Sequence, residues 1–429
     1  MTRLYMYDDE RARAFEPFCL TRPAGELRAG AELIRVRWEK RLQLEAGGFL
    51  GADHLRDFDE SGVPHAVPRD GTLEAGSVVA SSRCAVTLRE GSGDRGASAW
   101  VCGGRIAAVR LAAATPASAF ADGTLDLARL AEPAQRGSAA DDREPTAPST
   151  PMTPASGGGV VEIKGRWLNA TWDLIATLGE QLAEDIPAMA ARLTIHNPAE
   201  ARVLGEHAVY CERGAHLEPW VVLDATTGPI LVRGGASIAA FSRLVGPCYI
   251  GEGSTIIGDR VSTCSVGDVC KVRGEISNSI LLGHSNKGHT GFVGHSYLGR
   301  WVNLGAGTTT SNLKNTYGNV QLAMPGGVHD TGQQFLGTFF GDHVKTGIGT
   351  MLTTGTVLGA GANVFGSVPP PKRVPAFAWG EREPYGRFEL AKFLEVAARM
   401  MERRHVELSS RGREWLSTVY QKALRDQAD

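Results

Sequence analysis

One stretch of the chain, from Gly288 to Asn312, concentrates glycine, histidine and asparagine inside a pattern of apolar residues. It reads GHTGFVGHSYLGRWVNLGAGTTTSN. Among its side chains His289 is the strongest candidate for chemistry, because an imidazole titrates near neutral pH and is the group most often used for proton transfer. The structural alternative is a hydrogen-bonded histidine in a turn.

Apolar residues on both sides of this stretch recur at intervals of six. This period fits neither a helix nor a plain strand and indicates a repeat architecture. We expect a left-handed parallel β-helix, in which three hexads form one triangular coil and the coils stack to bury one aliphatic residue per hexad. A β-sandwich is the alternative, although its strands would alternate at period two. The repeated positions are Val232, Ile238, Leu244, Ile250, Ile256, Val266, Val272, Leu352, Leu358 and Val364.

Glycine and proline indicate the corners and the end of this column. Glycines at corners can adopt positive φ at little cost. Proline cannot extend a hydrogen-bonded ladder, so Pro369–Pro371 should end the β-helix. The candidate corner glycines are Gly246, Gly258, Gly267 and Gly305.

The N-terminal segment predicts a strand over Leu4–Tyr7, a loop, and a helix from Ala31 to about Leu42. A loop between strand and helix can present amides and cations to phosphate. The sequence contains neither GxxxxGK[ST] nor GxGxxG after the first strand, so a phosphate loop of either common kind is absent. In the alternative interpretation, Arg22 and Arg28 form ion pairs or cap a helix.

The chain of 429 residues is long enough for two or three domains. Residues 1–200 predict an α/β domain, residues 201–370 the β-helix, and residues 371–429 a helical extension. A flexible insertion is expected at about 132–159, where proline, serine, threonine, alanine and glycine dominate.

Charge and cysteine content exclude several classes of function. The net charge of −2 gives no reason to expect binding to nucleic acid or to a membrane surface. The seven cysteines never form a CxxC pair, which argues against a disulfide framework and a structural zinc site. Without a long apolar run or a signal-like N-terminus, a cytoplasmic protein is the expectation.

The hexads and the Gly288–Asn312 stretch together resemble the sugar nucleotidyltransferases that carry a left-handed β-helix. The resemblance is to the bifunctional N-acetylglucosamine-1-phosphate uridyltransferase/glucosamine-1-phosphate acetyltransferase enzymes and to glucose-1-phosphate thymidylyltransferase-like relatives. Those families carry G-H-x-x-[YF]-x-G, then VNIGAGT, then an asparagine. This chain has GHTGFVG from Gly288, VNLGAGT from Val302 and Asn312, without a gap. Leu313 stands where the family has an aromatic residue.

The resemblance implies an acyltransferase site on the β-helix. His289 would be the general base that deprotonates a sugar amine, which then attacks the thioester of acetyl-CoA. Asn303 and Asn312 would orient the sugar or hold the imidazole, and the Ala306 backbone would contact the acetyl donor. The candidate ligands for the sugar phosphate are Arg273, Lys287 and Lys345.

The resemblance also implies a nucleotidyltransferase site in the first domain. The family has a glycine-rich LxxGxGTRM loop and a later PKxL lysine. Here TRPAGELRAG stands in its place, so Arg22 or Arg28 would replace the loop arginine and Lys40 the lysine. Mg²⁺ would accompany an active nucleotidyltransferase, with Asp8 and Asp53 as candidate ligands.

Three functions remain open at this point. The first is acyl transfer at the β-helix, with nucleotidyl transfer from UTP or dTTP to a sugar-1-phosphate in the first domain. The second is nucleotidyl transfer alone, with the β-helix as an oligomerisation scaffold. The third is a non-catalytic assembly protein. The resemblance further implies a homotrimer, because its acyl sites lie between chains, and closed symmetry is favoured in oligomers.

Overall fold

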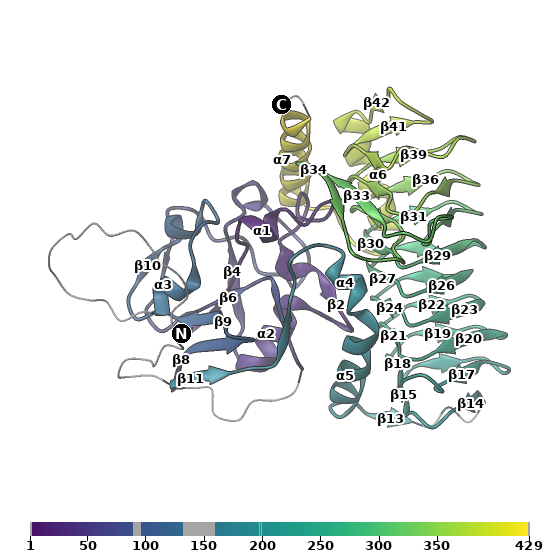
Figure 1. Cartoon of the computed structure of the whole chain (residues 1–429), viewed down its shortest axis with the longest axis horizontal. Helices are drawn as coiled ribbons and strands as arrows, with labels where there is room; N and C mark the ends of the chain where they lie inside the picture. The colour runs from purple at the N-terminus through teal and green to yellow at the C-terminus, as the bar shows by residue number, and fades with distance from the viewer. Residues whose placement is uncertain (1, 89–95, 132–158, 197, 199, 428–429) are drawn as a thin grey trace, which may run out of the picture.

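The computed structural model describes residues 2–88, 96–131, 159–196, 198 and 200–427. An α/β domain lies beside a long column of stacked coils, and the C-terminal helices flank the column (Figure 1). The flexible insertion expected at about 132–159 falls almost wholly outside the described residues. In the described part of the chain, no helix has the length and apolar character needed to cross a bilayer.

The α/β domain is built on a mixed sheet of six strands. Strand β1 pairs in parallel with β4 and β6, and β9 runs antiparallel to β6 and β8. The strands β1, β4 and β6 therefore end at one edge of the sheet. In sheet order they are β11 (Gly159–Glu162), β8 (Ala97–Cys102), β9 (Arg105–Arg110), β6 (Val78–Ser81), β1 (Leu4–Tyr7) and β4 (Ala46–Leu50).

Short strand pairs and helices complete this domain. The predicted helix begins three residues later than expected, because Glu32–Leu33 pairs as a strand with Arg28–Ala29. The pairs are β2 (Arg28–Ala29) with β3 (Glu32–Leu33), β5 (Thr72–Leu73) with β10 (Thr115–Pro116), and β7 (Cys84–Val86) with β12 (Gly165–Trp167). The helices are α1 (Glu10–Arg13), α2 (Ile34–Leu42), α3 (Leu127–Ala131), α4 (Asp173–Ala176) and α5 (Leu178–Ala190).

The column is a left-handed β-helix, as the period of six predicts. Its three sides are parallel sheets, apart from antiparallel pairs at the two ends. The first side contains β13 (Ile195–His196), β15 (Val209–Glu212), β18 (Ile230–Val232), β21 (Cys248–Ile250), β24 (Ser265–Val266), β27 (Ile280–Gly283), β30 (Tyr297–Arg300), β35 (Phe339–Phe340), β38 (Val357–Leu358) and β40 (Arg373–Val374). The second contains β14 (Arg202–Leu204), β17 (Val222–Asp224), β20 (Ser242–Val245), β23 (Asp259–Ser262), β26 (Glu275–Ser277) and β29 (Phe292–Gly294).

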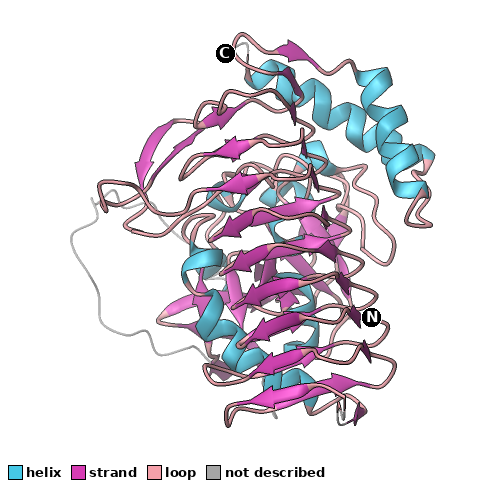
Figure 2. Ribbon diagram, turned by 90° about the vertical axis from the view of Figure 1, so that its right-hand side faces the viewer, coloured by secondary structure: helices cyan, strands magenta, loops and turns pink. Residues whose placement is uncertain are grey.

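The third side of the column carries most of the candidate site. It contains β16 (His216–Leu217), β19 (Ser237–Ile238), β22 (Thr255–Ile256), β25 (Lys271–Val272), β28 (Asn286–Lys287), β31 (Asn303–Leu304), β36 (Lys345–Thr346), β39 (Asn363–Val364), β41 (Ala378–Gly380) and β42 (Gly386–Arg387). The pair β32 (Thr309–Thr310) and β37 (Met351–Leu352) and the hairpin β33 (Gln321–Met324) and β34 (Gly327–Asp330) lie outside these sheets. Figure 2 shows the stacked coils face on, with α6 (Leu390–Glu402) and α7 (Ser410–Asp426) beside one end.

The core of the column includes the predicted hexad residues. All ten aliphatic residues of the repeat are buried and belong to one cluster inside the coils. The β-helix prediction is therefore confirmed at the level of individual side chains.

Two details of the column differ from the sequence expectation. Gly246, Gly267 and Gly305 do not have positive φ. They are required because a Cβ atom would lie within 2.6 Å of the backbone of the neighbouring coil. The ladder also continues past Pro369–Pro371, since β40 pairs with β38 and β41 with β39. The prolines lie in the connection between β39 and β40, where no ladder N–H is needed.

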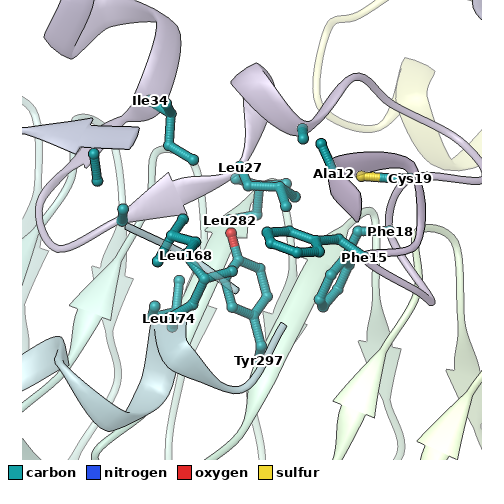
Figure 3. Packing of buried hydrophobic residues seen from close by; sticks show 14 of the residues in the cluster. Ala12, Phe15, Phe18, Cys19, Leu27, Ile34, Leu168, Leu174, Leu282 and Tyr297 are labelled. Atoms are coloured by element: carbon teal, nitrogen blue, oxygen red, sulfur yellow. The ribbon is translucent and has the colours of Figure 1, made fainter. Parts of the chain in front are cut away.

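The α/β domain is packed directly on the column. Figure 3 shows Phe15, Phe18 and Leu27 of the N-terminal loop against Leu282 and Tyr297 of the β-helix. The rings of Phe18 and Tyr297 are 4.5 Å apart, and the Tyr297 hydroxyl accepts a hydrogen bond from the Arg28 N–H at 2.8 Å. The loop between β1 and α2 therefore forms part of the interface between the two bodies.

Candidate functional site

His289 lies in the turn between β28 and β29, and its side chain is exposed. Its imidazole makes no hydrogen bond within the described part of the chain. The Thr290 carbonyl accepts a hydrogen bond from the Gly307 N–H at 3.1 Å. This bond places the turn that carries His289 directly against the turn that contains Ala306.

Ala306 offers a main-chain donor beside this turn. Its carbonyl accepts from the Gly349 N–H at 2.7 Å. Its own N–H has no hydrogen-bond partner among the residues that the structure describes. A free amide of this kind can bind a carbonyl oxygen and stabilise negative charge that develops on it.

Asn303 lies in the coil that follows the coil of Asn286 and His289, and it is paired with Asn286 in the register. Its Oδ1 accepts a hydrogen bond from Nδ2 of Asn286 at 2.7 Å. The register places both residues in one outward-facing column, which continues to Lys345 and Asn363. Asn286 was not predicted as a site residue. Its signal in the sequence is its place three residues before His289.

Asn312 holds an imidazole, but it is not that of His289. Its Nδ2 donates to Nδ1 of His295 at 2.8 Å, and the His295 ring stacks on Phe335 with centres 5.4 Å apart. Burial lowers the pKa of His295 to about 4. The sequence signal for His295 is its place one hexad after His289.

Lys287 does not point toward solvent as a sugar-phosphate ligand would. It occupies an inward position of the coil, opposite Val272 in the register, and is fully buried. Its ammonium group donates to the carbonyl oxygens of Arg273, His289 and Thr290. Burial lowers the pKa of Lys287 to about 8. The side chain therefore supports the turn of His289 from inside the column.

Arg273 and Lys345 have different surroundings. Arg273 lies in the preceding coil beside the His289 turn, is half-exposed, and pairs loosely with Asp259 at 3.4 Å. Lys345 follows Asn303 in the outward column, but its Nζ donates to the His343 carbonyl and contacts the Met400 sulfur at 3.7 Å. Of these two cations, Arg273 is the one accessible from the His289 turn.

The cations of the N-terminal loop are buried at the interface between the two bodies. Arg22 is 1% exposed and forms ion pairs with Glu60 and Asp342, both at 2.8 Å. Arg28 is also buried, and its guanidinium donates to the Ala31 carbonyl. The structure thus favours ion pairing over phosphate binding for Arg22. Lys40 remains partly exposed and pairs with Glu32 at 2.6 Å.

The two candidate carboxylates, Asp8 and Asp53, do not form a Mg²⁺ site together. Asp8 is buried, and its Oδ2 accepts from the Ala24 N–H at 2.8 Å. Asp53 is exposed and forms an ion pair with Arg69 at 3.6 Å. No group of three or more histidine, cysteine, aspartate or glutamate residues suited to a metal occurs within the described ranges. Mg²⁺ prefers several oxygen ligands in an octahedron, which these residues do not offer.

Comparison with known proteins agrees with this architecture. Residues 4–193 match the family described as sugar nucleotidyl transferase. A bifunctional sugar-1-phosphate nucleotidylyltransferase/acetyltransferase of Sulfurisphaera tokodaii is 34% identical over 91 residues, which cover 21% of this chain and 23% of that protein. The bifunctional protein GlmU of Desulfitobacterium hafniense is 26% identical over 195 residues, 39% of each chain. The matches therefore span well under half the length of these relatives.

A solved hexapeptide transferase family protein from Anaplasma phagocytophilum aligns with 54% of this chain and 98% of its own, at 14% identity and a TM-score of 0.21. That similarity is too low to bear on function. Residues 4–193 therefore match the sugar nucleotidyl transferase family, and a left-handed β-helix follows them in the same chain.

Proposed function

We propose that the β-helix catalyses acetyl-CoA-dependent N-acetylation of an amino sugar phosphate. The observation that supports this proposal is the hydrogen bond from the Gly307 N–H to the Thr290 carbonyl, because it joins the turn that carries the exposed His289 to the turn that contains the free amide of Ala306. The names of the relatives, which include an acetyltransferase, support the same class of reaction.

In the proposed reaction the His289 imidazole takes a proton from the sugar amine. The amine nitrogen then attacks the thioester carbonyl, a carbon–nitrogen bond forms, and the carbon–sulfur bond breaks as the thiolate of coenzyme A leaves and takes the proton that His289 holds. The Ala306 N–H would bind the carbonyl oxygen of the acetyl donor. Asn303 would orient the sugar, and Arg273 would pair with its phosphate.

Thiol release from acetyl-CoA in the presence of glucosamine-1-phosphate tests this function. We expect release with the amino sugar phosphate and none with glucose-1-phosphate, which lacks the amine. Equal release with both compounds, or none with a panel of amino sugar phosphates, would refute it.

Nucleotidyl transfer in the first domain is the second candidate, and the family match of residues 4–193 favours it. The test is pyrophosphate release from UTP or dTTP with a sugar-1-phosphate, using Lys40→Ala as the variant because Lys40 is partly exposed. If both assays fail, a non-catalytic assembly protein is the better description.

We also propose a homotrimer as the working state. Exposed Trp220 and Phe241 stack at one corner of the column with ring centres 5.6 Å apart, and such apolar groups are suited to contact with another chain. Small-angle scattering in solution tests the state, and a monomer would contradict an acyl site shared between chains.

A further inference from the structure

Two cysteine residues of the first domain lie where a two-stranded sheet meets the six-stranded sheet. Cys84 begins β7, and Cys102 ends β8. Strand β7 pairs with β12 outside the six-stranded sheet, whereas β8 belongs to that sheet. Both thiols are free and buried, with exposed fractions of 0% and 3%. A covalent bond between the two sulfurs would therefore join the two sheets.

Trp167 of β12 brings the strands of the two cysteines together. It is the register partner of Cys84 in the antiparallel pair of β12 and β7, and such partners place their side chains on the same face. Its indole N–H donates to the Cys102 carbonyl at 2.9 Å. The Cys84 carbonyl is held in turn by the indole N–H of Trp38 at 2.9 Å. One tryptophan thus contacts both strands, and a second fixes the backbone of Cys84.

The two thiols contact each other, and the contact makes them unequal. The side chains of Cys84 and Cys102 are hydrogen-bonded, and this bond together with burial raises the pKa of Cys84 well above its ordinary value. The same bond lowers the pKa of Cys102, and Arg105 acts in the same direction, whereas burial and Glu162 oppose it. Cys84 is therefore the donor, and Cys102 is the sulfur that more readily carries negative charge. The thiolate is the reactive form of cysteine.

Cys102 lies beside an open turn. It is paired with Arg105 across the hairpin of β8 and β9, and the turn between them consists of exposed Gly103 and Gly104. A Cβ atom on either glycine would meet nothing within 4 Å. This turn is the route by which a small oxidant such as hydrogen peroxide would approach the end of β8.

A second pair of cysteines provides an internal comparison. Cys248 and Cys264 lie in neighbouring coils of the column, where the Tyr249 N–H donates to the Cys264 carbonyl at 2.9 Å. Both side chains are fully buried in the column core. Burial raises the pKa of both thiols, that of Cys264 to about 12. This pair is close in space but protonated at neutral pH and shielded from solvent.

We propose that Cys84 and Cys102 form a redox-sensitive pair, which hydrogen peroxide converts to a disulfide that ties β7 to β8. The Cys102 thiolate attacks one peroxide oxygen, the oxygen–oxygen bond breaks, and the hydroxide that leaves takes up the proton released by Cys102. The Cys84 sulfur then attacks the sulfenic acid on Cys102, the sulfur–oxygen bond breaks, and a second water leaves with the Cys84 proton. Two thiols are oxidised and one peroxide is reduced to two waters. The proposal rests on neither acyl transfer nor nucleotidyl transfer.

Peptide mapping of the folded full chain after treatment with hydrogen peroxide, without reductant, tests the pair. We expect a linked peptide pair that contains Cys84 and Cys102 and that dithiothreitol separates, while Cys248 and Cys264 stay unlinked. Amide hydrogen exchange at Gly165–Trp167 should slow in the oxidised protein, because the disulfide ties the partner strand of β12 to the larger sheet. Absence of the link between Cys84 and Cys102, equal linkage of Cys248 to Cys264, or unchanged exchange would overturn the proposal.

Single substitutions identify the sulfur that reacts first. In Cys84→Ala, where Arg105 still faces Cys102, dimedone should trap a sulfenic acid on Cys102. In Cys102→Ala, Cys84 should be labelled at least tenfold less. Labelling of Cys84 equal to that of Cys102 would contradict the proposed order of attack. Circular dichroism should verify that both variants fold, and the peptide map of the parent chain tests the disulfide without either of them.

Discussion

The ammonium group of Lys287, inside the column, donates to the main-chain carbonyl of His289, on its surface. Two further carbonyls of the neighbouring turns, from Arg273 and Thr290, accept from the same group at 3.2 Å. A buried cation usually costs stability unless its protons are all bound. Here the three acceptors account for the three donors of the ammonium. The position of His289 therefore depends on a side chain that substrate cannot reach.

Replacement of Lys287 by methionine should loosen the His289 turn without unfolding the column. The lost bonds to carbonyls cost about 1–3 kcal/mol, and removal of a buried charge offsets much of this cost. We expect a change in unfolding free energy below about 1 kcal/mol, but clearly faster amide hydrogen exchange at residues 288–291. The matched control is Lys271→Met, because Lys271 belongs to β25 of the same side but its side chain is exposed. Unaltered exchange in the Lys287 variant would contradict the bracing role.

His289→Ala should lower kcat for thiol release by about 100-fold or more, the range typical for loss of a general base. The thermal midpoint should stay the same, because the side chain is exposed and makes no hydrogen bond with the described residues. His216→Ala, an exposed histidine lower on the same side of the column, serves as the control. A His289 variant as active as the parent would remove the proposed base.

Arg22→Met should destabilise the protein strongly. Burial alone would raise the pKa of Glu60, but the positive charges of Arg22 and Arg300 lower this pKa to about 2. Removal of Arg22 leaves Glu60 and Asp342 buried with fewer positive partners, and breaking a buried pair costs about 3–5 kcal/mol.

Urea denaturation measures this loss. The control is Arg243→Met, which breaks a half-exposed pair with Asp224 and should change stability by less than about 1 kcal/mol. Equal effects of the two substitutions would contradict the importance of burial at the domain interface.

Acid should destabilise the protein through His343. Burial lowers the pKa of this imidazole to about 3 from its ordinary value of 6.5. Between these pH values the unfolded chain binds a proton that the folded chain does not, so stability falls as pH falls. The slope from one such group is at most about 1.4 kcal/mol per pH unit.

His343→Asn removes this titration at a position with φ of 62°, which asparagine tolerates. We expect a shallower fall in unfolding free energy between pH 6 and pH 4 than in the parent, as measured by urea denaturation at each pH. His216→Asn should leave the slope unchanged. A slope in the His343 variant equal to that of the parent would show that another group controls acid stability.

Much of the fold could be predicted because it follows from local periodicity. The aliphatic residues at steps of six, such as Ile250 and Ile256, can all be buried only if each hexad forms one side of a stacked coil. The strand Leu4–Tyr7 and the C-terminal helices were likewise visible as short apolar patterns. The reason for glycine at Gly246 was not visible, because it depends on how closely the next coil approaches.

The candidate site was predicted less completely, since hydrogen-bond partners come from different coils. The sequence indicated His289, Asn303 and Ala306, and the structure places the turn of His289 against the turn of Ala306. It could not show that Asn312 would hold His295, or that Lys287 would point inward at a position where other coils carry Val272 or Leu304.

The sequence by itself determined that the chain contains a β-helix and that one histidine-rich stretch lies on it, because repeat period and residue type are local properties. Only the tertiary structure decided which charges are buried. Arg22 lies in the segment expected to bind phosphate, yet it forms an ion pair with Asp342, more than 300 residues away in the sequence. Which cation is neutralised depends on the packing of two bodies against each other, and no local pattern contains that information.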